Sequence, residues 1–206
     1  HLNCQFISGN ALYYRSVSPR DMKSRNLAFA SVMGALAVVI SLMRLQVPFP
    51  LLFYLKFDLA EVPSFITFYL AGLYPSILCA FLHFLGLLVR GSSIFGSSMK
   101  FAAVASNLLG IGLVRKSRVA GLLGGCVSRV AVMSVINFVT LSFLFPNYMD
   151  FSMKALEAAG INVSSRTEAF IIVLALIAAF NTIHALLSSL AGLAIVEAIK
   201  RRLPSL

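Results

Sequence analysis

The chain has 206 residues, of which 59% are hydrophobic and only 12% charged, and its mean hydropathy is +0.91. This composition excludes an ordinary soluble domain and leaves no length for a soluble catalytic or ATP-binding domain. The formal net charge is +10, but the basic residues flank long apolar runs, as the positive-inside rule predicts for membrane proteins. We therefore expect a lipid membrane around the chain and no nucleic acid as a partner.

The first apolar run covers Asn26 to Met43 and follows a basic segment, so we expect a membrane helix that starts on the cytoplasmic side. Residues 1–25 form the preceding cytoplasmic segment, to which we assign no structure. The run contains two small-xxx-small pairs, Ala30 with Gly34 and Ser31 with Ala35, which let another helix approach closely. Both pairs could pack against another helix of the same chain or against another protein, and the sequence leaves both interpretations open.

The next segment, Arg44 to Phe57, contains two prolines and reads as a loop too broken to be a helix. Asp58 and Glu61 have the spacing of a capping box, in which Asp58 accepts from early amides and Glu61 reaches back. The run Val62 to Val89 carries no charge but is divided by Gly72 to Pro75. Two short helices joined by a tight turn fit this pattern better than one long helix.

Three further spans follow. The fourth covers Phe101 to Val114 and is short unless Gly91 to Lys100 extends it, and the fifth ends at Phe145, before a proline. An outer loop with a short amphipathic helix at Met153 to Ala159 comes next. The sixth span contains Ala169 to Val196, which has no charged side chain and is long enough to cross a hydrocarbon layer of about 30 Å.

The distribution of Lys and Arg tests this topology. Ten fall in segments that it places inside, six fall outside, and Arg129 falls within the fifth span. The bias favours six helices with both termini in the cytoplasm. The predicted fold is an all-α integral membrane protein, a six-transmembrane-helix bundle formed by residues 26–203 as one domain.

Arg129 is the one charged residue inside an expected span. If the fifth span starts at Val119, the guanidinium lies near mid-membrane, at a cost of at least about 2.5–3.5 kcal/mol. A start near Gly125 instead lets the side chain extend to the cytoplasmic face. We expect the later start.

Neutral polar side chains recur in the last three spans: Asn107 in the fourth, Asn137 in the fifth, and Asn181, His184 and Ser188 in the sixth. The last three follow a helical stripe. They serve either hydrogen bonds between helices or a binding pocket. Their convergence from spans five and six favours a pocket near the outer face for a ligand with carbonyls, ring nitrogens and hydroxyls.

No catalytic or metal-binding motif is present, so we expect no enzymatic activity, no catalytic residues, no metal and no cofactor. An intramembrane enzyme would need paired acids at membrane depth, and Asp58 and Glu61 form the only close acidic pair. The capping box accounts for that pair without chemistry. We expect His83 to pack or to form a hydrogen bond. A structural protein without any ligand is the remaining alternative.

Three motifs in the expected order resemble those of one transporter family. Residues 55–63, LKFDLAEVP, resemble the L-K-x-D-[LF]-[SA]-[DE]-[IV]-P signature of substrate-binding S components of energy-coupling-factor (ECF) transporters. Asn137-Phe138 with Pro146 resembles the end of helix five in the riboflavin-specific branch. Residues 180–184, FNTIH, resemble the F-N-x-x-K of its helix six. The riboflavin-specific branch is the nearest match.

The resemblance implies a six-helix protein of the cell membrane that binds a vitamin from outside and works with a transmembrane T component and two ATPases. It implies that Ala30, Gly34, Ser31 and Ala35 contact the T component. It also implies that Asn137, Asn181 and His184 contact riboflavin, and we add Lys56 of the first motif, Asn107 and Ser188. His184 replaces the lysine of the family, so another vitamin or precursor also fits the sequence.

Overall fold

The structure is a computed structural model that describes residues 24–52, 54–114 and 117–202. The predicted segment 1–25 lies outside the described residues except for Ser24 and Arg25, which already belong to the first helix. The described elements are α1 (Ser24–Leu42), β1 (Gln46–Pro48), β2 (Lys56–Asp58), a 3-10 turn (Leu59–Glu61), α2 (Val62–Ala71), α3 (Leu73–Val89), α4 (Ile94–Leu113), α5 (Arg118–Val139), a π-helical turn (Thr140–Leu144), α6 (Asn147–Ala158) and α7 (Arg166–Arg202).

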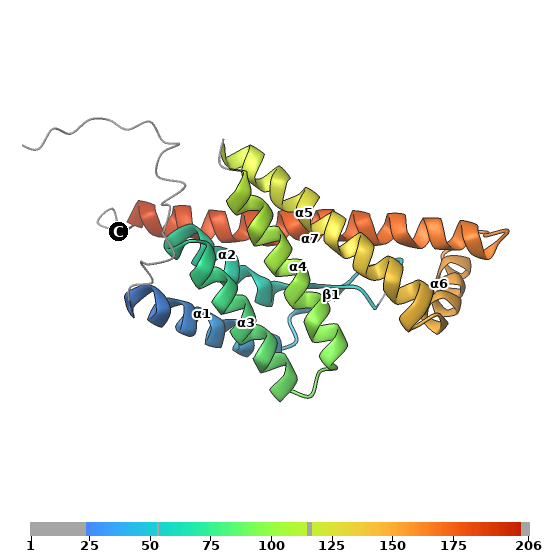
Figure 1. Cartoon of the computed structure of the whole chain (residues 1–206), viewed down its shortest axis with the longest axis horizontal. Coiled ribbons are helices and arrows are strands. Elements are labelled where there is room, and N and C mark those ends of the chain that lie inside the picture. The colour runs from blue at the N-terminus through green and yellow to red at the C-terminus, as the bar shows by residue number, and fades with distance from the viewer. Residues whose placement is uncertain (1–23, 53, 115–116, 203–206) are drawn as a thin grey trace, which may run out of the picture.

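The helices form one bundle in which α7 extends along the whole length of the molecule (Figure 1). α7 packs against α2 and α5, α4 packs against α5, and α3 packs against α1 and α4. α1 begins at the same end of the molecule at which α7 finishes, and α6 lies at the opposite end (Figure 1). The start of α1 and the end of α7 therefore lie at one end of the molecule, and six spans with both termini in the cytoplasm stay a prediction.

Within the described part of the chain, four helical segments are long and apolar enough to cross a membrane: 24–42, 94–113, 118–144 and 166–202. Two shorter apolar helices, Leu59–Ala71 and Leu73–Val89, lie between the first two. The division of Val62 to Val89 into two helices is confirmed. It occurs at Gly72, whose φ of 95° lies in the region that favours glycine.

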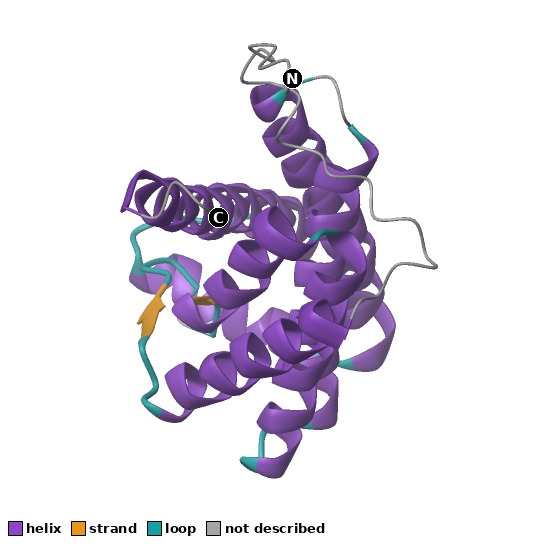
Figure 2. Cartoon of the chain, turned by 90° about the vertical axis from the view of Figure 1, so that its left-hand side faces the viewer, coloured by secondary structure: helices purple, strands orange, loops and turns teal. Residues whose placement is uncertain are grey.

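The loop Arg44 to Phe57 contains more regular structure than the sequence predicted. β1 and β2 form a two-stranded antiparallel hairpin, in which Gln46 lies opposite Asp58 and Pro48 opposite Lys56 (Figure 2). The Phe49 amide donates to the Leu55 carbonyl, 2.8 Å apart, and continues the pairing beyond the strands. Strands of three residues are too short to show an alternating pattern, and Pro48 argues against a strand unless it lies at an edge.

The fifth helix begins earlier than predicted. α5 starts at Arg118, after Ser117, whose hydroxyl accepts a hydrogen bond from the Ala120 amide. The prediction of a start near Gly125 was wrong because it treated the glycines at 121–125 only as weak helix formers. A Cβ on Gly125 would lie 2.3 Å from Asn107 Oδ1, so glycine allows α4 and α5 to touch there.

α4 begins at Ile94 and α6 at Asn147, each several residues before the predicted start. Ser93 caps α4 through its hydroxyl, which accepts from the Gly96 amide at 3.1 Å. At the far end of the molecule, Leu52 of the loop and Leu156 of α6 are buried against Val173 of α7. This packing holds the hairpin segment and α6 over one end of the bundle.

Candidate substrate-binding site

A cavity of about 550 Å³ opens between the hairpin segment, the start of α4, the second half of α5 and the first half of α7. Its volume lies within the range of small-molecule binding sites, roughly 300–1,000 Å³. The elements meet because α5 crosses α7, and because Phe49 and Phe57 of the hairpin segment lie against Phe180 of α7. The cavity lies in the half of α7 that is nearer to α6, which is the half that the predicted topology places outside.

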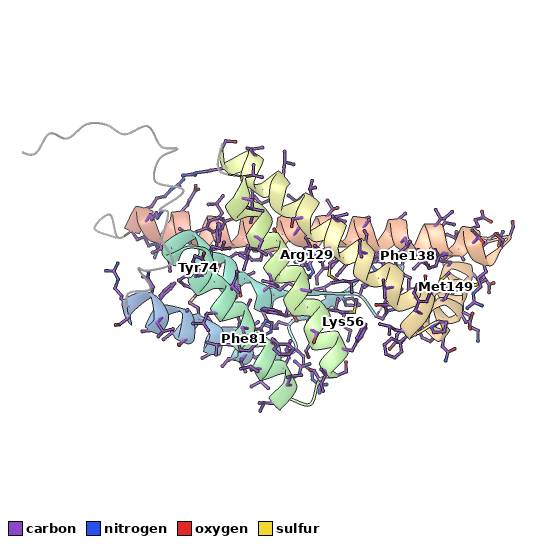
Figure 3. The ribbon with its side chains drawn as sticks, viewed as in Figure 1. Lys56, Tyr74, Phe81, Arg129, Phe138 and Met149 are labelled. Atoms are coloured by element: carbon purple, nitrogen blue, oxygen red, sulfur yellow. The ribbon has the colours of Figure 1, made fainter. Side chains whose placement is uncertain are left out.

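The floor of the cavity contains a buried ion pair between Arg129 of α5 and Glu61. The Arg129 Nη1 donates to Glu61 Oε2 at 2.7 Å and Nη2 donates to Oε1 at 3.2 Å. Both side chains are 2% exposed, and Figure 3 shows Arg129 where α5 crosses α7. The prediction that Arg129 reaches the cytoplasmic face was therefore wrong. Glu61 neutralises the guanidinium inside the chain, so the side chain has no need to reach water.

The Arg129 side chain also connects the pair to α7. Its Nε donates to Asn181 Oδ1 at 3.2 Å, and its Nη2 lies 3.0 Å from His184 Nδ1. Because a guanidinium only donates, Nδ1 accepts in this contact, and the Asp58 amide donates to Nε2 at 3.2 Å. That Nε2 faces Glu61 Oε2 at 3.4 Å. The stripe found in the sequence is thus held in one network with Arg129 and Glu61.

The capping-box prediction is half right. Asp58 caps the 3-10 turn, because its Oδ1 accepts from the Ala60 amide at 3.0 Å. Glu61 does not reach back but binds Arg129. The second oxygen of Asp58 accepts from Gln46 Nε2 at 2.8 Å and from Lys100 Nζ of α4. Asp58 thereby ties the hairpin to α4 at the edge of the cavity.

Aromatic rings form much of the remaining wall: Tyr54, Phe95, Phe145, Tyr148 and Phe180. Phe95 and Phe145 have ring centroids 5.1 Å apart, and Tyr54 and Tyr148 have centroids 6.2 Å apart. Burial raises the pKa of the Tyr54 phenol more than its hydrogen bond with Ser152 lowers it, so the hydroxyl stays protonated. Such a wall favours a flat, largely apolar ring system.

The structure brings four of the predicted binding residues to the cavity and leaves two away from it. Asn137, Asn181, His184 and Lys56 line the cavity. Asn137 donates to the Met133 carbonyl at 2.7 Å, so its amide oxygen is the group that a ligand could use. The other two predicted residues do not line the cavity. Asn107 is buried between α4 and α5. Ser188 donates to Glu61 Oε2 at 3.4 Å.

Sequence reasoning missed several residues of the site. Glu61, Arg90, Ser97 and Lys100 line the cavity as well as Arg129. Arg129 had a usable signal, because a charge inside an apolar span marks a functional position by default. The others lie in loops or in the first two turns of a helix, where a polar residue is ordinary. His83 forms the expected hydrogen bond, with Nε2 2.6 Å from Ser41 Oγ.

The four small residues of α1 do not share one environment. Ala30 is fully buried and Gly34 is buried, and a Cβ on Gly34 would lie 2.8 Å from Leu82 Cβ of α3. This pair therefore packs within the chain and is not available to a partner in this conformation. Ser31 and Ala35 are exposed.

A family model for the substrate-specific component of ECF transporters matches residues 25–196. The chain belongs to this family, whose members are substrate-binding components of membrane transporters. One solved structure, described as showing the structure and mechanism of the S component of a bacterial ECF transporter, has the same fold. It is 22% identical, with a TM-score of 0.67, over 87% of this chain and 97% of that chain. No curated protein matches the sequence.

Family membership and the apolar helices make the chain a multi-pass integral membrane protein of the cell membrane. Membership also implies a small-molecule substrate and a partnership with a T component and ATPases. The fold is that of an S component, mostly helical and built around the spans described above.

Proposed function

We propose that the cavity binds a vitamin from the outer face, with riboflavin as the first candidate, for import driven by a T component and two ATPases. The observation that carries this proposal is that Asn137, Asn181 and His184 meet in one cavity lined by aromatic rings. The motifs around these residues resemble those of the riboflavin-specific branch. Amides and aromatic rings together suit a flat heterocycle with several carbonyls and ring nitrogens.

His184 is the main departure from that branch, which has a lysine at this position. In the structure Arg129 Nη2 lies 3.0 Å from the His184 ring. A cation is thus present beside position 184, but it comes from α5 and is paired with Glu61. Because the network differs, a related vitamin or a precursor is the second candidate for the same cavity.

We propose no catalytic role for the acidic pair. Asp58 binds Lys100 and Gln46 while it caps the 3-10 turn, and Glu61 binds Arg129. These contacts give each carboxylate a structural role. The exposed pair Ser31 and Ala35 on α1 remains our candidate for contact with the T component, together with the exposed apolar residues Val32 and Leu36 beside it.

The visible absorption spectrum of the full chain, purified in detergent from cells grown with riboflavin, tests the proposed ligand. Flavin bands in about stoichiometric amount, lost in Asn137→Leu but kept in Lys154→Gln, are the expected result. Lys154 is exposed on α6 and does not line the cavity, so it is a matched control. A colourless protein that gains no bands when riboflavin is added would remove riboflavin and direct the search to other vitamins.

A further inference from the structure

The cavity carries more positive than negative charge. Its lining includes Lys56, Arg90, Lys100 and Arg129. Glu61 neutralises Arg129 and Asp58 neutralises Lys100. Among the described residues, no carboxylate forms an ion pair with Lys56 or Arg90. Arg90 Nη1 donates to the Ser41 carbonyl, which carries no formal charge, so both residues keep their positive charge at the cavity that they line. A cleft with apolar walls strengthens the field of these charges.

The first turn of α4 lies in the same part of the cavity. Ser93, Phe95, Gly96 and Ser97 all line it. α4 is 20 residues long, so the amides of its first turn present the positive end of a helix dipole to whatever occupies this region. Figure 3 shows Lys56 in the view beside the N-terminal half of α4, and both line one cavity.

Ser97 supplies a separate observation. Its side chain is almost fully buried, at 2% exposed, and its hydroxyl has no hydrogen-bond partner among the described residues. A buried hydroxyl without a partner is destabilising, and native proteins keep few of them. The residue lines the cavity, so its hydroxyl lies beside the space that a ligand would occupy. A ligand acceptor would give it the missing partner.

We propose that the transported ligand carries an anionic group, a phosphate or a carboxylate, and that this group binds at the first turn of α4. Arg90 and Lys56 supply the charge, and the Ser97 hydroxyl donates a hydrogen bond to an oxygen of the anion. The inference rests on the proposed function and narrows its substrate class. Riboflavin itself is neutral, so within the flavins the proposal points to a derivative with an acidic side chain.

The first test compares three flavins that share one ring system: riboflavin, riboflavin 5′-phosphate and 10-carboxymethylflavin. Each is titrated into the detergent-purified full chain, and quenching of flavin fluorescence reports binding. We expect at least one anionic flavin to bind about tenfold or more tightly than riboflavin, which corresponds to about 1.4 kcal/mol. The relative affinities of the phosphate and the carboxylate identify which anion the site takes.

Single substitutions test where the anionic group of the ligand binds. Lys56→Gln and Ser97→Ala should each remove most of the preference for the anionic flavin, measured as the ratio of the riboflavin Kd to the Kd of the anionic flavin. Ser97→Ala also removes an unpartnered hydroxyl, so the ligand-free protein should unfold at the same or a higher temperature. Lys154→Gln should behave as wild type in every titration. Riboflavin binding as tightly as both anionic flavins, or a preference that survives in both variants, would overturn the proposal.

A second measurement separates this proposal from the flavin assignment. If no flavin binds, the flavin assignment falls, and inorganic phosphate then tests the anion site alone. At matched ionic strength with chloride as reference, phosphate should raise the melting temperature of wild type and of Lys154→Gln but not of Lys56→Gln. If no flavin binds and phosphate also fails to stabilise wild type, the proposed anion site is overturned.

Discussion

A guanidinium buried between α5 and α7 has to be neutralised largely within the chain, because only 2% of its surface is exposed. Arg129 meets this requirement through Glu61, Asn181 and His184, which hold every nitrogen of its side chain in a hydrogen bond. Removing one partner of a buried pair leaves an uncompensated charge, whereas replacing both partners with apolar residues is often nearly neutral. At the residue scale, the network should therefore be stable only as a unit.

We expect Glu61→Gln to lower the free energy of unfolding by about 3–5 kcal/mol, because Arg129 stays charged and buried. The double variant Glu61→Leu with Arg129→Met should recover most of that loss. Thermal unfolding of the detergent-purified proteins measures both. If Glu61→Gln has the same melting temperature as wild type, the ion pair between Glu61 and Arg129 does not stabilise the floor of the cavity.

Asp58 combines two roles that substitution can separate. Asparagine keeps the oxygen that caps the 3-10 turn but removes the charge that binds Lys100. Asp58→Asn should therefore cost about 1–3 kcal/mol, because the buried side chain loses the oxygen that accepts from Lys100 and Gln46. Asp58→Ala loses the cap as well, and we expect it to be less stable than Asp58→Asn by roughly another 1 kcal/mol. Equal melting temperatures for the two variants would show that the cap contributes nothing.

At the scale of the elements, the contact between α4 and α5 depends on glycine. A Cβ on Gly110 would lie 2.4 Å from the Gly124 carbonyl oxygen of α5, which is backbone and cannot move aside. A Cβ on Gly112, two residues further along α4, would meet Leu73 at 3.4 Å, an ordinary contact. Gly110 and Gly112 thus differ in what surrounds them, although the sequence gives no sign of it.

Gly110→Ala should separate α4 from α5 and lower the melting temperature by several degrees, since overpacking costs about 1–3 kcal/mol. Gly112→Ala should leave stability unchanged or raise it by up to about 1 kcal/mol, because alanine favours the helix. Parallel thermal unfolding curves compare the two. A Gly110→Ala protein as stable as Gly112→Ala would contradict the close approach of the two helices.

Some of the secondary-structure elements were predictable from the sequence and others were not. The turn at Gly72 was predictable because glycine and proline interrupt an apolar run, and the cap at Asp58 was predictable from its spacing. The hairpin was not, because its three-residue strands carry no pattern. The partner of Arg129 was not predictable from the sequence. Glu61 lies 68 residues earlier in the chain, and only the tertiary fold brings the two together.

The same limit applies to the site. Asn137, Asn181 and His184 were predictable because polar groups are rare inside apolar spans, and all three line the cavity. Asn107 has the same appearance in the sequence but lies between α4 and α5, away from the cavity. A single sequence cannot tell these two environments apart, because both place a polar side chain on a buried helix face.

For the whole molecule, the orientation in the membrane decides which side supplies the ligand. The charge bias of the sequence predicts six crossings with both termini in the cytoplasm, and this topology places α6 and the cavity outside. Asn162 is exposed in the segment between α6 and α7, and Arg202 is exposed at the end of α7. Cysteine substitutions at these two positions sample the two ends of the molecule.

In a background with Cys4 replaced by serine, a membrane-impermeant maleimide should label Asn162→Cys in intact cells. It should label Arg202→Cys only after the cells are permeabilised. Cys79 and Cys126 are buried and give a low background. Labelling of Arg202→Cys in intact cells would invert the topology and move the cavity to the cytoplasmic side.

The central claim is that this cavity is the vitamin site of an S component. The most direct measurement is a titration of riboflavin into the detergent-purified full chain, followed by quenching of flavin fluorescence, with Asn137→Leu and Lys154→Gln in parallel. The account predicts saturable binding of about one flavin per chain, weakened about tenfold or more by Asn137→Leu and unchanged by Lys154→Gln. Saturable binding that Asn137→Leu leaves unchanged, in a variant that melts as wild type does, would contradict the claim.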